Sequence, residues 1–156
     1  MASLLFTWKV IVMQNLIDSI KNKMNLYIKE NGIIYSMSAT APDTYERLVA
    51  ECTPTRLIVW DGASESSVWG LEGNYLFRAV HDSVHIEYGL AFTDADEAAV
   101  CYKTIELLKL NKAEAEILEA EIVGQLEYKN IYGYFPVNQT EFLLSYINHK
   151  REKLII

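Results

Sequence analysis

A helical hydrophobic repeat constrains this fold most strongly, and it runs from about Gly73 to the end of the chain. Apolar residues recur there at three- and four-residue steps, the spacing of amphipathic helices. The pattern predicts helices over about 74–88, 94–110, 112–130 and 138–153, with a break at "GYFPVNQ". We therefore expect this part of the chain to form a bundle of about four helices.

The first part of the chain has a different pattern. A long helix is predicted over about 3–29, and Asn31-Gly32 ends it. "GIIYSMSA" and "RLIVWD" have the β-branched, partly alternating pattern of short strands. Between them, Pro42-Asp43-Thr44 is expected to open a short helix that ends near Ala50. The N-terminal part should therefore contain one long helix and a small two-stranded β element.

Length and composition fit one folded domain. The chain has 156 residues, of which 51% are hydrophobic. That is enough for one core, whereas two full domains are not the default at this length. We predict a single domain over 1–156 of the α+β, mainly α class. Its α/β part is 1–70, and its helical part is 71–156.

Charge and cysteine usage argue against several partner classes. The formal net charge of −7 repels nucleic acid and anionic membrane surfaces. The apolar run from Leu4 to Met13 is interrupted by Lys9 and is well short of the roughly 20 residues that a membrane span needs. Cys52 and Cys101 have neither zinc-knuckle spacing nor a disulfide framework. These features predict a cytoplasmic protein without membrane association or strong nucleic-acid binding.

Two histidines in "FRAVHDSVHIEYGLAF" provide the strongest site signal in the chain. Each helical residue advances by about 100°, so Arg78, His81 and His85 share one face. Histidines four residues apart can bring both imidazoles to one cation, as in H-E-x-x-H zinc sites. Here the intervening residue is Asp82, which is shorter than the protease glutamate, so we expect it to orient an imidazole. The alternative is two histidines half exposed at the edge of a core helix.

Three further polar residues are candidates to complete this site. Glu97 lies three residues after Asp94, which fits a capping box with Asp94 as the cap. Alternatively, Glu97 projects back toward the histidine helix across the short "TDAD" connection. Glu121 and Gln125 lie between apolar positions of their helix, so a partly buried carboxylate is expected. Such a carboxylate needs a partner, either on the histidine helix generally or as an ion pair with Arg78.

The order of these motifs resembles that of a protein family. The chain contains "FRAVHD", a histidine four residues after His81, "GLAF", an acidic helix start ending in Glu97, "AEIVGQLEY" and "FPVNQTEF". This series, over about 75–143, is similar to a group of small bacteriophage and mobile-element proteins and to domains of large phage polyproteins. The resemblance implies a phage accessory protein with a shared site rather than a particular reaction. It gives that site the polar positions His81, Asp82, His85, Glu97, Glu121 and Gln125.

The first functional interpretation is a phage enzyme, metal-dependent or acid–base, acting on a nucleotide, a nucleic-acid base or another small anionic substrate. Its predicted metal ligands are His81, His85 and Glu97, its catalytic residues Glu121, Asp82 and Arg78, and its substrate-binding residue Gln125. Glu121 is also an alternative third ligand, and Arg78 would hold an anionic group such as phosphate. The cofactor would be a divalent metal such as zinc, iron or manganese.

The second interpretation is a non-catalytic phage protein, either a host-factor binder or a virion or assembly component. The same polar cluster would then be a structural network. The long N-terminal helix suits partner binding or homo-oligomerisation, and either class of protein could use it. Solvent access separates the two: an enzyme needs the histidine face to open onto a pocket, whereas a structural network is sealed and fully paired. The expected location is the host cytoplasm or the virion.

Overall fold

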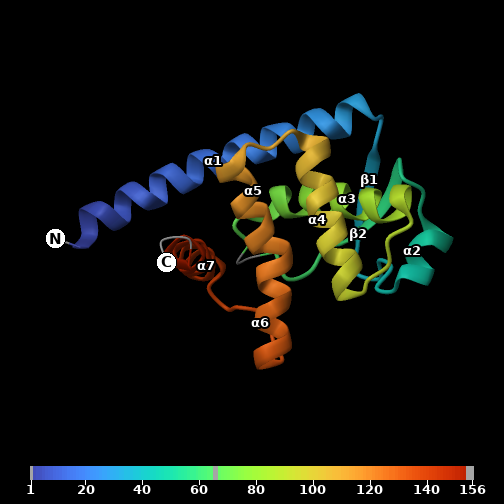
Figure 1. The fold of residues 1–156 in the computed structure, drawn as a ribbon. Coiled ribbons are helices and arrows are strands. Elements are labelled where there is room, and N and C mark those ends of the chain that lie inside the picture. The colour runs from blue at the N-terminus through green and yellow to red at the C-terminus, as the bar shows by residue number, and fades with distance from the viewer. Residues whose placement is uncertain (1, 65–66, 154–156) are drawn as a thin grey trace.

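A computed structural model of the protein describes residues 2–64 and 67–153. In chain order its elements are α1 (Ala2–Glu30), β1 (Ile34–Ser38), α2 (Tyr45–Glu51), β2 (Arg56–Trp60), α3 (Gly70–Tyr88), α4 (Asp94–Leu108), α5 (Lys112–Glu119), the π-helical turn η1 (Ala120–Gly124), α6 (Gln125–Tyr132) and α7 (Gln139–Lys153). The fold is α+β and mainly α, as predicted, with a long first helix, a two-stranded sheet and a helical C-terminal part (Figure 1). The predicted loop "GASESS" includes residues 65–66, which lie outside the described residues.

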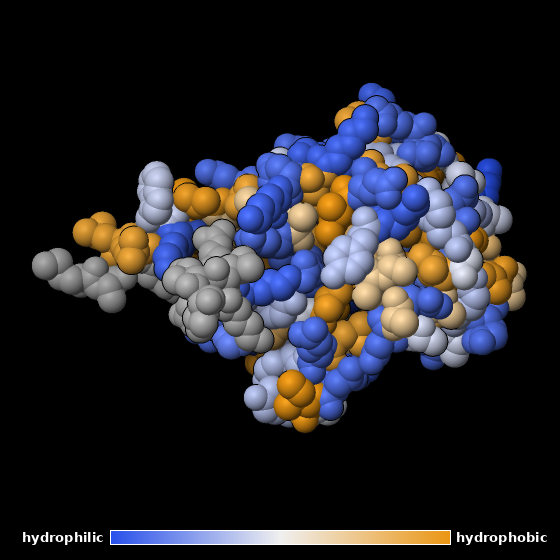
Figure 2. Space-filling view, in the orientation of Figure 1, coloured by the Kyte–Doolittle hydropathy of each residue, from blue (hydrophilic) through white to orange (hydrophobic). Residues whose placement is uncertain are grey.

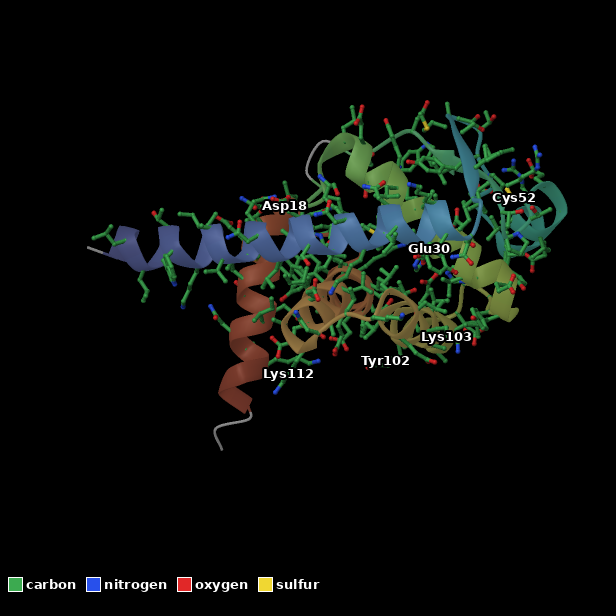
Figure 3. All side chains as sticks on the ribbon, turned by 90° about the horizontal axis from the view of Figure 1, so that it is seen from above. Asp18, Glu30, Cys52, Tyr102, Lys103 and Lys112 are labelled. Carbon is green, nitrogen blue, oxygen red and sulfur yellow. The ribbon has the colours of Figure 1, made fainter. Side chains whose placement is uncertain are left out.

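Helix α1 lies across the other helices and reaches beyond them at its N-terminal end (Figures 1 and 3). Its C-terminal half buries Ile17, Ile20 and Met24 in the core. The apolar pattern continues to the other end, where Leu5 and Trp8 are 64% and 65% exposed because this end of α1 reaches beyond the other described helices. Hydrophobic residues accordingly gather at the projecting end in Figure 2. No described helix has the length and apolar character needed to cross a membrane.

The two strands are parallel and are connected by α2. Tyr35 pairs with Leu57, and Met37 pairs with Val59. Helix α2 begins after Thr44, whose Oγ1 accepts a hydrogen bond from the backbone N–H of Arg47 at 3.1 Å. The helix therefore starts slightly later than the proline pattern predicts, because the threonine side chain satisfies one of the free N–H groups of the first turn.

Helix α3 connects the sheet to the helical part. Leu76 and Val80 pack in the main core, which also includes buried residues of α1, α4, α5, η1 and α7. Ala79, on another side of α3, packs in a second cluster with Leu57 and Val59 of β2. Because residues of one helix belong to both hydrophobic clusters, the orientation of α3 is set from two sides. This is the helix that carries the predicted histidine pair.

The predicted helix over 112–130 contains a local widening. It continues from α5 into α6, but η1 interrupts the α-helical hydrogen bonding over Ala120–Gly124. Helix α7 approaches closely at this point, since a Cβ atom on Gly124 would lie 2.8 Å from the ring of Tyr146. Single π-helical turns inside helices occur frequently at functional sites, because they change the direction of the side chains around them.

Candidate metal centre and pocket

His81, His85 and Glu97 come together between α3 and α4. The two Nε2 atoms of the histidines are 3.1 Å apart, and the Glu97 carboxylate lies 2.9 Å from His81 Nε2 and 3.2 Å from His85 Nε2. Metal–ligand bonds of about 2.0–2.1 Å in tetrahedral geometry place neighbouring ligand atoms about 3.3 Å apart. The triangle thus has nearly the size that one divalent cation requires, and these three residues can hold a metal.

The turn after α3 sets the orientation of His85. Gly89 ends the helix in the left-handed conformation (φ 65°), and the next carbonyl, that of Leu90, lies 2.7 Å from His85 Nδ1. A carbonyl can only accept, so Nδ1 carries a proton, and Nε2 is the atom on the side of Glu97 and His81 that takes up either a second proton, donated to Glu97, or a metal ion. This tautomer, fixed by a backbone carbonyl, is the one that metal-bound histidines usually adopt. Leu90 is not among the predicted site residues, and the local signal for its role is Gly89, a residue type typical of a helix end.

Glu97 belongs to the first turn of α4, but the predicted cap is wrong. Thr93, not Asp94, is the N-cap, and its Oγ1 accepts from the backbone N–H of Asp96 at 3.2 Å. The Asp96 carboxylate in turn accepts a hydrogen bond from the backbone N–H of Ala91 at 2.9 Å, which ties the connection between α3 and α4 to the first turn of α4. The side chain of Glu97 takes no part in the cap and faces the histidines, as the alternative prediction had it.

Electrostatics within the cluster favour a bound cation or proton. Burial raises the pKa of Glu97, but the hydrogen bonds and positive charge of the two histidines outweigh it and hold the pKa at about 2. Burial lowers the pKa of His85, but the hydrogen bond and charge of Glu97, together with Leu90 and Asp82, bring it above the ordinary value. Glu97 is therefore anionic, and a metal ion would take the place of the proton on the imidazole.

The cluster opens onto a pocket of about 730 Å³. Side chains of five predicted site residues line it: Arg78, His81, Glu97, Glu121 and Gln125. His81 and Glu97 keep 18% and 15% of their side-chain surface exposed, whereas His85 is fully buried behind them. The buried Nδ1 of His81 has no hydrogen-bond partner among the described residues. The histidine face is thus open to solvent on one side and incompletely paired.

Glu121 is in the pocket but outside the metal group. Its Oε2 accepts a hydrogen bond from Gln125 Nε2 at 2.9 Å, and its buried Oε1 has no partner in the part of the chain that the structure describes. Within that same part, neither predicted partner is found, since Glu121 makes no ion pair with Arg78 and no hydrogen bond to a histidine. Burial raises the pKa of Glu121 to about 8, so the carboxyl is largely protonated at neutral pH.

Asp82 does not make the predicted contact. Among the described residues, it donates or accepts no hydrogen bond with either imidazole, and it does not line the pocket. One helical step of about 100° separates it from His81, which turns its side chain away from the histidine face. Burial raises its pKa to about 6, against the lowering influence of His81 and His85. Asp82 therefore acts on the imidazoles through charge alone.

Two cations at the pocket are stacked on aromatic rings. Arg78 donates a hydrogen bond to the carbonyl of Trp60, and its guanidinium lies 5.2 Å from the centre of the Trp60 ring. Lys129 Nζ lies 4.8 Å from the centre of the Phe135 ring. Neither cation forms an ion pair with a carboxylate within residues 2–64 and 67–153. Trp60, Lys129 and Phe135 line the pocket but are not among the predicted site residues, although Lys129 lies one helical turn after Gln125.

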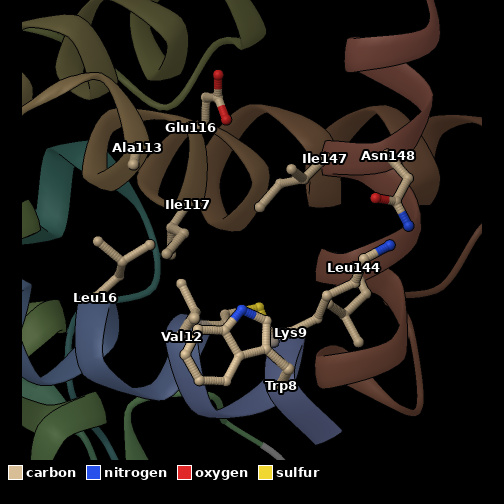
Figure 4. A pocket seen from close by; sticks show the side chains of 11 residues that line it. Trp8, Lys9, Val12, Leu16, Ala113, Glu116, Ile117, Leu144, Ile147 and Asn148 are labelled. Carbon is tan, nitrogen blue, oxygen red and sulfur yellow. The ribbon is translucent and has the colours of Figure 1, made fainter. Parts of the chain in front are cut away.

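A second, smaller pocket of about 240 Å³ lies among α1, α5 and α7. Figure 4 shows Val12 and Leu16 of α1 near Ile117 of α5, with Leu144 and Ile147 of α7 on another side. Its lining contains no histidine and no counterpart of the metal group. The candidate site is therefore the pocket at α3 and α4.

Comparisons with protein-family models, with curated proteins and with solved structures find no match to this chain.

Proposed function

We propose that this protein is a small metal-dependent enzyme of a bacteriophage or mobile element, acting on a small anionic substrate such as a nucleotide. The observation that carries the proposal is a pair of histidines and a carboxylate at hydrogen-bonding distances, open to a pocket of about 730 Å³. The phage origin rests on the motif resemblance alone, and with it the expected location in the host cytoplasm.

The donor set supports a catalytic rather than a structural metal. Structural zinc sites are closed by four protein ligands, whereas catalytic sites use three and keep a position for water or substrate. Two histidines and one carboxylate also form the usual ligand set of non-haem iron enzymes. Zinc, iron and manganese are therefore the candidate metals. When bound, such an ion polarises a substrate oxygen or lowers the pKa of a bound water.

The remaining pocket residues have complementary roles in this proposal. Arg78 and Lys129 bind the negative charge of the substrate, since no carboxylate among the described residues neutralises them. Glu121, held protonated by burial, acts as a hydrogen-bond donor or general acid rather than as the metal ligand or base that the sequence alone left open. Gln125 orients Glu121 and contacts the substrate.

The alternative, a non-catalytic host-factor or assembly protein, requires a sealed network. Two observations disfavour it: His81 and Glu97 face the pocket, and buried atoms of His81 and Glu121 lack partners among the described residues. The projecting end of α1, with its exposed apolar residues, remains a candidate surface for a host protein or for a second copy in either case.

The decisive experiment is metal binding with a histidine control. We would measure metal content after native purification by elemental mass spectrometry, and then titrate the chelator-treated protein with Zn²⁺, Mn²⁺ and anaerobic Fe²⁺ by calorimetry. One equivalent is expected in the parent protein and none in His81→Ala/His85→Ala. His149→Ala is the matched control, because His149 is an exposed histidine of α7. Equal binding by the double variant, or none by the parent, would refute the metal centre.

A further inference from the structure

The pocket contains a polar pair that the metal centre does not use. Glu121 lies in η1 and Gln125 directly follows it, so the π-helical turn places both side chains in the pocket. The turn itself is tightly held, because the backbone of Gly124 packs against the ring of Tyr146 with no space for a Cβ atom. The pair is therefore presented on a rigid element rather than on a loop.

The pair has unused hydrogen-bonding capacity. Gln125 Nε2 donates to Glu121 Oε2, which leaves Glu121 Oε1 without a partner among the described residues. Within the same residues, no hydrogen bond reaches Gln125 Oε1. A buried polar group left unpaired costs free energy, so a ligand that pairs with Glu121 Oε1 gains affinity there, and Gln125 Oε1 beside it can accept a second hydrogen bond from the same ligand. With the carboxyl protonated, the pair offers one O–H donor beside one amide acceptor.

The entrance of the same pocket supplies charge and aromatic surface. Trp60 and Phe135 are 48% and 49% exposed, and each carries a cation over its ring. Arg78 and Lys129 are suited to a phosphate, and the rings are suited to a flat apolar group. A ligand that satisfies the whole lining is therefore anionic and planar, and it has an N–H next to a C=O.

We infer that Glu121 and Gln125 read the N–H/C=O edge of a nucleobase, while Arg78 and Lys129 hold the phosphate of the same nucleotide. This inference rests on the proposed function for the identity of the pocket as a substrate site. It requires no metal, because none of these four residues belongs to the metal group. The substrate class thus narrows from small anions to nucleotides with a lactam edge.

The test compares two nucleotides with a sugar phosphate that lacks the base. We would measure the binding of UMP, GMP and ribose 5-phosphate by calorimetry, in the parent protein and in Glu121→Leu, Glu121→Gln and Gln125→Leu. Glu127→Gln is the control, an exposed glutamate of α6 outside the pocket lining. Circular dichroism of each variant checks its fold.

At least one nucleotide should bind about ten-fold or more tightly than ribose 5-phosphate, because two hydrogen bonds and a stacking surface are added. Glu121→Leu and Gln125→Leu should remove most of that preference. Glu121→Gln should keep it within about three-fold, since an amide also donates a hydrogen bond. Glu127→Gln should bind as the parent does. Should Glu121→Leu fail to fold, Gln125→Leu decides the matter, and a preference that survives this variant would then overturn the inference.

Equal binding of ribose 5-phosphate, or no nucleotide binding at all, would overturn the inference. A preference that survives both leucine variants would overturn it too. Metal titration on the same samples separates this outcome from failure of the proposed function. If the protein binds metal but does not prefer the nucleotides, the metal centre stands and base recognition by Glu121 and Gln125 is refuted. If it prefers the nucleotides but binds no metal, base recognition is supported and the proposal of a metal-dependent enzyme is refuted.

Discussion

Replacing Glu121 by glutamine should stabilise the protein, and more so as the pH rises. Burial raises the pKa of this carboxyl from 4.5 to about 8, so the folded state holds its proton more tightly than the unfolded state does. Stability is then lost as the pH rises from the unfolded to the folded pKa. Glutamine has nearly the same shape, keeps the contact with Gln125 and has no charge to desolvate. The variant therefore avoids this loss.

The magnitude follows from the size of the shift. Each pKa unit corresponds to about 1.4 kcal/mol, so a rise from 4.5 to about 8 is equivalent to at most about 5 kcal/mol above pH 8. The Glu121 side chain keeps some exposure to the pocket, which lowers the cost of ionisation. We expect a gain of about 1–3 kcal/mol for Glu121→Gln at pH 8.5, and nearly none at pH 5.

The assay is urea unfolding of chelator-treated protein at pH 5, 7 and 8.5, with Glu127→Gln as the control. Taking the difference between variant and parent cancels the titration of other groups, Asp82 included. Glu127 is exposed, so its replacement should change the unfolding free energy by less than about 0.5 kcal/mol at every pH. A Glu121→Gln difference that does not grow with pH would refute the argument that Glu121 is a buried, protonated acid.

Three further outcomes are expected. Glu114→Ala should cost about 2–4 kcal/mol at pH 7, because Glu114 is fully buried against Lys23 at 2.6 Å. Since the pKa of Glu114 is lowered from 4.5, this contribution is present above pH 4.5 and is lost as the pH falls below it, which urea unfolding of parent and variant from pH 7 down to about pH 2.5 would show. His85→Ala should lower Zn²⁺ affinity about 100-fold or more while far-ultraviolet circular dichroism stays helical. Gly89→Ala should cost about 1 kcal/mol in thermal unfolding, because alanine disfavours the left-handed conformation, and an unchanged stability would contradict the assigned turn.

The helical and strand elements could largely be predicted from sequence. Amphipathic spacing is a local property, so the long first helix, both strands and the later helices were found within a few residues of their observed ends. Helix α3 begins at Gly70 rather than near 74. The π-helical turn was missed. It lies where Tyr146 of α7 packs against Gly124, a contact between distant parts of the chain that apolar spacing along one helix does not reveal.

In the candidate site, too, local spacing predicted some features and contacts between distant elements decided the others. The i, i+4 spacing alone placed His81 and His85 together, since a helix brings such residues onto one face. Whether Glu97 faces these histidines depended on the packing of α4 beside α3, so only the tertiary structure decided it. The protonation state of Glu121 could not be predicted from the sequence either. Its pKa depends on how many groups from other elements exclude water and on whether any brings an opposite charge, and spacing along one helix determines neither.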